Sequence, residues 1–216
     1  GSEGDENLEG DSDENSTSSE TEESSTESEG DSADDTEGEE GCGLTPACGD
    51  DMALQLGFND IVSDSDVSNT ELDPGWQSIV DARAGGISNA ATNPWIYLRF
   101  TSQGLEKVAI DDFSSLEESS WDIAAKRYWI RTNGGVSGPS CVGVSRHDEP
   151  FGTIEDTDDL EIVEEAYYDA QCTLQEDDSG LPGSPLFAMD GWWEYPGCVA
   201  TSKQPFILHL ADGRRI

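Results

Sequence analysis

Hydrophobic and polar residues alternate in short runs along residues 76–216, and turn residues separate these runs. Alternation with a period of two is typical of β-strands that bury one face. The runs are rich in Trp, Tyr, Phe, Ile and Val, which favour a pleated, half-buried surface. Gly, Pro, Asn and Asp between the runs predict tight turns. The predicted strands are Ile79–Ala82, Trp95–Phe100, Glu106–Ile110, Trp121–Thr132, Ser140–Ser145, Gly191–Tyr195 and Pro205–Leu210.

The longest alternating run, Trp121–Thr132, has no cleanly apolar face. This pattern is expected of a long strand whose buried side changes at a sheet edge or a bulge. The run enters Asn133-Gly134-Gly135, where a positive φ costs little, and Cys141–Ser145 follows it. We therefore predict a hairpin over residues 121–145.

One segment, Asp158–Cys172, is ambiguous between a helix and a strand with a loop. Its apolar residues recur at helical spacing, and acidic residues stand where a helix would begin. The same residues also fit extended structure, so both interpretations stay open. With seven strands and at most one short helix, the pattern predicts an all-β fold, a single antiparallel domain over residues 76–216.

Residues 1–40 form an acidic tract of Ser, Thr, Glu, Asp and Gly, with 18 acidic residues and no basic ones. Such a segment cannot bury enough apolar surface to offset the backbone entropy lost on ordering, and its like charges repel. We predict a disordered tether, which by random-coil scaling would span roughly 35 Å. A low-affinity calcium store is the alternative, because carboxylate oxygens suit hard cations.

Residues 41–75 are a transition segment that contains Cys42 and Cys48. Their spacing predicts a small disulfide-closed loop and does not fit a Cys-x-x-Cys metal motif. Asp64, Asp66 and Ser68 alternate like the start of an EF-hand loop, but the required later Gly and Glu are absent. Cys141, Cys172 and Cys198 allow one further pair and leave one cysteine over, and five cysteines favour an oxidising, exported setting.

The formal net charge is −38, from 48 acidic and 10 basic residues. A charge this negative repels phosphate backbones and anionic headgroups, which argues against nucleic-acid binding and against polybasic membrane docking. No run of 18 apolar residues is present to span a bilayer. Because no export segment opens the numbered chain, we expect a mature or trimmed product. Because Asp212-Gly213 predicts a hairpin turn just before Ile216, we also expect further residues after it.

No catalytic motif is evident. Gly143-Val144-Ser145-Arg146-His147 lacks the second Gly of a nucleophile elbow, and no Walker or dinucleotide pattern occurs. Paired carboxylates for glycoside hydrolysis cannot be chosen among 48 acids, because their pairing is spatial. Trp192-Trp193 with Tyr195 would suit a sugar platform, but core packing is the preferred interpretation. We expect no enzyme.

A family resemblance rests on the middle of the chain. Trp121-Asp122-Ile123-Ala124, then Arg127-Tyr128, Arg131, Asn133-Gly134 and Ser137-Gly138, resembles the central segment of the HmuY-like lipoprotein family. Flanking stretches, including Pro94–Phe100, Gly191–Tyr195 and Phe206–Leu208, are similar to its other strands. The resemblance covers about residues 79–216.

The resemblance implies a non-catalytic, all-β surface lipoprotein of a Gram-negative bacterium. Such a protein binds haem, or a related tetrapyrrole, and passes it to an outer-membrane haem receptor. It would be anchored through an N-terminal lipid outside this numbering, with the acidic tract as its linker.

Haem iron takes an imidazole, thioether, thiolate or phenolate as axial ligand. The candidate ligands are His147, Met189 and His209. For each, the alternative is an ordinary role: an exposed loop histidine, a packing methionine and a strand histidine with a local partner. The family's axial ligands lie near the strand matching Gly191–Tyr195, yet Pro196-Gly197-Cys198 follows it here. A second hypothesis is therefore a surface interaction or structural module of the same fold that has lost haem ligation.

Overall fold

The computed structural model describes residues 48, 53–83, 86, 89, 92–154 and 160–216. By its internal contacts the chain divides into two units, Gly1–Gly38 and Glu39–Ile216. The predicted acidic tether and Cys42 lie outside the described residues.

Antiparallel strands make up the regular structure, which confirms the predicted all-β class. A short 3₁₀ helix, η1, lies at Ser114–Leu116, and residues 53–55 form a helical turn. The strands are β1 Val67–Glu71, β2 Trp76–Val80, β3 Ile96–Thr101, β4 Gly104–Val108, β5 Ile123–Lys126, β6 Trp129–Thr132, β7 Gly143–Arg146, β8 Trp193–Glu194, β9 Ala200–Thr201 and β10 Phe206–His209.

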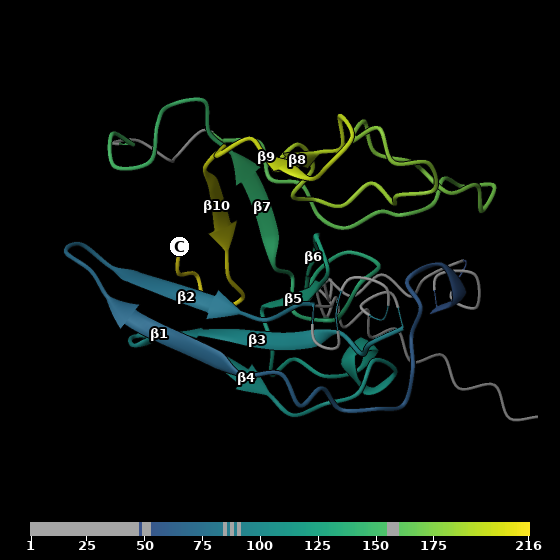
Figure 1. Ribbon diagram of the computed structural model, residues 1–216, viewed down its shortest axis with the longest axis horizontal. Coiled ribbons are helices and arrows are strands. Elements are labelled where there is room, and N and C mark those ends of the chain that lie inside the picture. Colours follow the sequence, from purple (N-terminus) through teal and green to yellow (C-terminus); the bar gives the residue numbers. More distant parts are fainter. Residues whose placement is uncertain (1–47, 49–52, 84–85, 87–88, 90–91, 155–159) are drawn as a thin grey trace, which may run out of the picture. The chain divides into compact units, whose positions relative to one another are not determined.

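The largest sheet has the order β4-β3-β5-β6, and all its neighbours are antiparallel (Figure 1). Ile96, Tyr97 and Leu98, the first residues of β3, and Trp95 just before them are all almost completely buried. Consecutive buried residues mean that both faces of the strand are covered, as in a central strand. Three two-stranded sheets accompany it: β1-β2, β10-β7 and β8-β9.

The predicted single strand Trp121–Thr132 is wrong, because the run folds back on itself as β5 and β6. Lys126 pairs with Trp129, and a two-residue turn of Arg127 and Tyr128 joins the strands. Arg127 has φ 57°, the positive φ that tight hairpins require at a turn residue. Because the turn lies within the run, the alternation of apolar and polar residues starts again after it. This explains why neither face of the whole run is apolar.

The predicted hairpin over residues 121–145 is also wrong, because β6 pairs with β5 and not with β7. Strand β7 pairs with β10, in the register Phe206 with Arg146 and His209 with Gly143. Residues 214–216 then return along β10, with reciprocal backbone hydrogen bonds between Leu208 and Ile216.

The described part of Asp158–Cys172 is extended and not helical. Val163 pairs with Val144 through two backbone hydrogen bonds of 2.8 Å, and Tyr168 forms a bridge with Leu174. The strand-and-loop interpretation of this segment is therefore the correct one.

Two hydrophobic clusters form the core. The larger contains Leu56, Trp95, Tyr97, Trp121, Ala124, Tyr167 and Phe187. The smaller contains Val142, Leu208 and Leu210. Leu56 comes from the predicted transition segment, so this segment packs together with the β-strands.

The predicted Cys42–Cys48 disulfide is wrong, because Cys48 is bonded to Cys172. Their Cα atoms are 5.7 Å apart, and 124 positions separate them in sequence. Cys141 is also disulfide-bonded, while Cys198 is an exposed free thiol. Spacing along the chain favoured the near partner, but the fold brings the distant one into contact.

Candidate functional site

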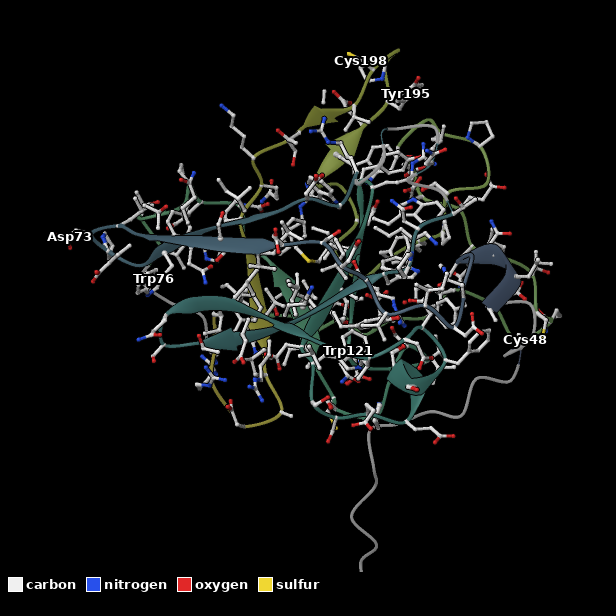
Figure 2. All side chains as sticks on the ribbon, turned by 60° about the horizontal axis from the view of Figure 1, so that its bottom comes forward. Cys48, Asp73, Trp76, Trp121, Tyr195 and Cys198 are labelled. Carbon is white, nitrogen blue, oxygen red and sulfur yellow. A yellow bond between two sulfur atoms is a disulfide. The ribbon has the colours of Figure 1, made fainter. Side chains whose placement is uncertain are left out.

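The residues of the Trp121–Gly138 segment build the core. Trp121 is fully buried, and its indole N–H donates to the Ser115 carbonyl at 3.0 Å (Figure 2). Asn133 is also fully buried and donates to the Trp121 carbonyl at 2.8 Å. The Asp122 carboxylate accepts the Phe100 N–H at 2.7 Å, which ties β3 to the start of β5. These side chains hold the strands together through buried and half-buried hydrogen bonds.

Two glycines of the same segment allow close backbone approach. A Cβ atom on Gly134 would lie 2.3 Å from the Val142 carbonyl oxygen. A Cβ atom on Gly138 would lie 2.0 Å from Oδ1 of Asn133. Both distances are too short for a side chain, so these glycines are needed for packing.

Arg131 is completely buried in an aromatic and hydroxyl cage. Its guanidinium donates to the Tyr97 hydroxyl at 2.7 Å and to Oγ of Ser115 and Ser137 at 2.7 and 2.9 Å. Its charge also lies within 5.3 Å of four ring centroids, those of Phe58, Trp95, Tyr97 and Trp121.

The hydroxyl of Tyr97 links Arg131 to a buried carboxylate. It donates to Asp112 at 3.0 Å, and Asp112 also accepts the Trp95 N–H at 2.9 Å. Burial raises the pKa of Asp112, and it raises the pKa of Tyr97 as well. A buried charge without partners is costly, so this network stabilises one arrangement of the core.

Two further buried ionisable groups were not distinguished by the sequence. Glu165 is 1% exposed and accepts the N–H groups of Thr132 and Ala188 at 2.8 and 3.0 Å. Burial raises the pKa of Glu165 to about 7. Lys126 donates to the Gly57 carbonyl at 2.7 Å, and burial lowers its pKa to about 8. Among 58 charged residues, nothing in the local sequence marks these two.

Arg127 and Tyr128, the turn residues between β5 and β6, face β8. The Tyr128 ring packs on Trp193 with centroids 4.2 Å apart, and the Arg127 guanidinium lies 4.7 Å from the Tyr128 centroid. Trp193 is 5% exposed, so it is a packing residue and does not form an open sugar platform.

Of the three predicted iron ligands, His209 has one ring nitrogen held by a side-chain hydrogen bond. Its Nε2 lies 2.8 Å from Oγ of Ser145, and that hydroxyl donates its single proton to the Glu161 carbonyl at 2.9 Å. Nε2 must therefore carry the proton that His209 donates, which leaves the lone pair on Nδ1. Burial, followed by the charge of Arg215, lowers the pKa of His209 and favours its neutral ring.

The two histidines lie at opposite ends of the β7–β10 ladder. His209 pairs with Gly143. His147 follows the last residue of β7 and donates its backbone N–H to the Pro205 carbonyl. Four residues of strand separate these positions, or roughly 13 Å.

The hydrogen bonds of His147 also oppose ligation. Its Nδ1 accepts the Glu149 N–H at 3.1 Å, which places the ring proton on Nε2. The outward nitrogen is therefore protonated and is not a ligand in this tautomer.

Met189 lies half-buried in the turn between Phe187 and Asp190. Its neighbour Ala188 is fixed by Glu165. Within the described residues no group of three or more His, Cys, Asp or Glu side chains is arranged to hold a metal ion. Of the two histidines, His209 is the one whose hydrogen bonds leave the lone pair on the nitrogen that Ser145 does not contact.

A cavity of about 380 Å³ lies beside β8 and the end of β7. Arg146 is its one basic lining residue, and its guanidinium lies against Gly191, where a Cβ atom would be 3.1 Å from Nη1. Three carboxylates outnumber this charge. The lining residues are Arg146, Asp178, Ser179, Asp190, Gly191, Trp193, Glu194 and Ser202.

No protein-family model matches the chain, and no curated protein matches it. Among solved structures it is similar to a protein from Bacteroides vulgatus that is described as HmuY-like and heme binding. The two are 19% identical over 74% of this chain and 84% of that chain, with a TM-score of 0.37. These values describe a remote likeness and place no ligand in this chain. In the described part of the chain, no helix is long and apolar enough to cross a membrane.

Proposed function

We propose that this chain is a non-catalytic binding protein that holds haem, or a related tetrapyrrole, with His209 as its axial ligand. The observation that supports this choice is the hydrogen bond from Nε2 of His209 to Ser145. Histidines that bind metals almost always donate their other ring N–H to a fixed acceptor, which sets the tautomer and the ring orientation. His209 has this arrangement, with Nδ1 left for iron.

The rest of the proposal follows the resemblance of residues 121–138 to HmuY-like proteins. On that basis we infer an exported protein held at the cell surface by a lipid anchor, with an outer-membrane haem receptor as its partner. The negative charge supports the absence of nucleic-acid partners.

A haemin titration followed by absorbance tests this proposal. We expect a shifted Soret band at micromolar haemin in the wild-type protein, and its loss or strong weakening in His209→Ala. His147→Ala is the matched control and should keep the band, because the outward Nε2 of His147 carries the ring proton. No Soret shift in the wild type, or an unchanged shift in His209→Ala, contradicts the proposal.

The cavity beside β8 favours a second candidate function, an interaction module of this fold without haem. Its net negative lining repels the two carboxylates of haem and suits a cationic or polar ligand. A wild-type protein that binds no haemin but is stabilised by a polar ligand, with the stabilisation reduced in Glu194→Gln, would support this candidate.

A further inference from the structure

The β1–β2 hairpin has one face that nothing in the described chain covers. Cross-strand partners share a face, and successive residues alternate between faces. One face therefore carries the pairs Ser68 with Ile79 and Thr70 with Gln77. Leu72 continues this face toward the turn. All five side chains are exposed, and Leu72 and Ile79 are 50% and 60% exposed.

The opposite face is anchored at Asn69 and Ser78, the middle pair of the ladder. There Asn69 exchanges hydrogen bonds with the Leu105 backbone at 2.9 and 3.2 Å, and Ser78 donates to Asn69 at 2.7 Å. Toward the tip, Trp76 pairs with Glu71 and is 39% exposed. Figure 2 shows Asp73 and Trp76 at the free end of this hairpin.

The backbone edges of the hairpin are open as well. Within the described residues, the backbone ladder of β1 and β2 joins each strand only to the other. An isolated two-stranded ribbon is marginally stable in water, and natural proteins usually protect open edges with Lys, Pro or a covering segment. Neither strand has a Lys or a Pro.

The chain segment that contains the hairpin is acidic, although Lys107 of β4 contacts it through the Ser63 and Ser65 carbonyls. Residues 53–82 contain no Lys or Arg, and their six acidic residues, Asp60, Asp64, Asp66, Glu71, Asp73 and Asp81, are all exposed. An acidic surface repels anionic lipid, and it repels a second copy of this chain, whose net charge is −38. The surface is complementary to Lys and Arg.

We infer that the β1–β2 hairpin is a docking site for an extended segment of another protein in which apolar residues alternate with Lys or Arg. Such a segment adds a strand to the open edge, its apolar side chains cover Leu72 and Ile79, and its cations meet the surrounding carboxylates. The inference does not depend on haem, because the hairpin shares no residue with the His209 site.

A fluorescently labelled peptide of alternating Lys and Val tests the inference by anisotropy with the full chain. A Lys–Ser peptide has the same charge without apolar side chains, and a Glu–Val peptide has the opposite charge. We expect the Lys–Val peptide to bind most tightly.

The Leu72→Ser/Ile79→Ser double variant should raise the Kd of the Lys–Val peptide about tenfold or more, because apolar burial is lost. Phe151→Ser removes an 85% exposed apolar side chain elsewhere and should leave Kd unchanged.

Hydrogen exchange on the wild-type protein gives a readout that needs no variant. The amides of residues 68–79 should exchange rapidly in the free protein and slow when the Lys–Val peptide is added. The inference is overturned if the double variant binds as tightly as wild type, if the Lys–Ser peptide binds equally well, or if exchange is unchanged. It is also overturned if sedimentation shows a dimer that the Leu72→Ser/Ile79→Ser variant does not form. Binding to phosphatidylcholine vesicles in a flotation assay, lost in the same variant, would overturn it too.

Discussion

Glu165 shows how tertiary position sets the chemistry of a single residue. Glu164 and Glu165 are adjacent and identical in type, yet only Glu165 is fully buried. It has two backbone N–H donors and no ion-pair partner among the described residues, so desolvation dominates and its pKa rises to about 7. Below about pH 7 its neutral form is therefore favoured in the folded state.

We expect Glu165 to make stability fall as pH rises. An unfolded Glu loses its proton near pH 4.5, whereas folded Glu165 holds its proton until about pH 7. Between these values the folded state binds more protons, so the free energy of unfolding should decrease by about 3 kcal/mol from this group. Urea unfolding at pH 5 and pH 7.5 should show a smaller decrease in Glu165→Gln than in wild type. The exposed Glu161→Gln control should behave like wild type, and equal pH dependence in all three proteins would contradict the assignment.

At the scale of elements, two short connections decide the topology of the main sheet. The Arg127–Tyr128 turn makes β5 and β6 neighbours, although no Gly or Asn marks it in the sequence. After β6 the chain passes Asn133 and Gly134 and packs directly on Val142, which donates its N–H to Asn133 at 3.0 Å. The Asn-Gly-Gly pattern correctly indicated a turn here, but it does not join a strand pair.

Gly134→Ala should destabilise the fold strongly. The new Cβ atom would lie 2.3 Å from a backbone carbonyl, which cannot move as a flexible side chain would. We expect a loss of about 3 kcal/mol, near the upper range for overpacking, measured from the urea midpoint. Gly213→Ala is the control: it has open space but φ 82°, so backbone strain should cost about 1 kcal/mol. If Gly134→Ala lost less unfolding free energy than Gly213→Ala, the prediction would be contradicted. The backbone around Val142 would then have moved to make room for the new Cβ atom.

At the scale of the described molecule, the Cys48–Cys172 disulfide joins the segment before β1 to the loop after Tyr168. The same early segment supplies Leu56 to the core, and its carbonyl accepts the Trp95 indole N–H at 3.1 Å. Sequence composition separated residues 41–75 from the β-strands, but packing and a covalent bond connect them.

Removing this disulfide should lower stability because it closes a long loop. The Cys48→Ser/Cys172→Ser double variant should lose about 2–5 kcal/mol of unfolding free energy. Thermal unfolding would show the loss as a lower Tm, and peptide mapping without reductant would identify the Cys48–Cys172 link in the wild type. Cys198→Ser should have little effect, since that thiol is exposed and unbonded. An unchanged Tm in the double variant would contradict a stabilising role.

Local alternation and turn residues predicted the all-β class and most strand positions, and the family resemblance singled out residues 121–138. Even there, β1 and β9 were missed, since exposed or very short strands lack alternation. Tertiary structure alone decided the strand partners, the disulfide and the burial of Arg131, Glu165 and Lys126. It also separated His147 from His209 and paired His209 with Ser145. These outcomes depend on which residues far apart in the sequence come into contact in the fold. A local sequence pattern contains no information about such contacts.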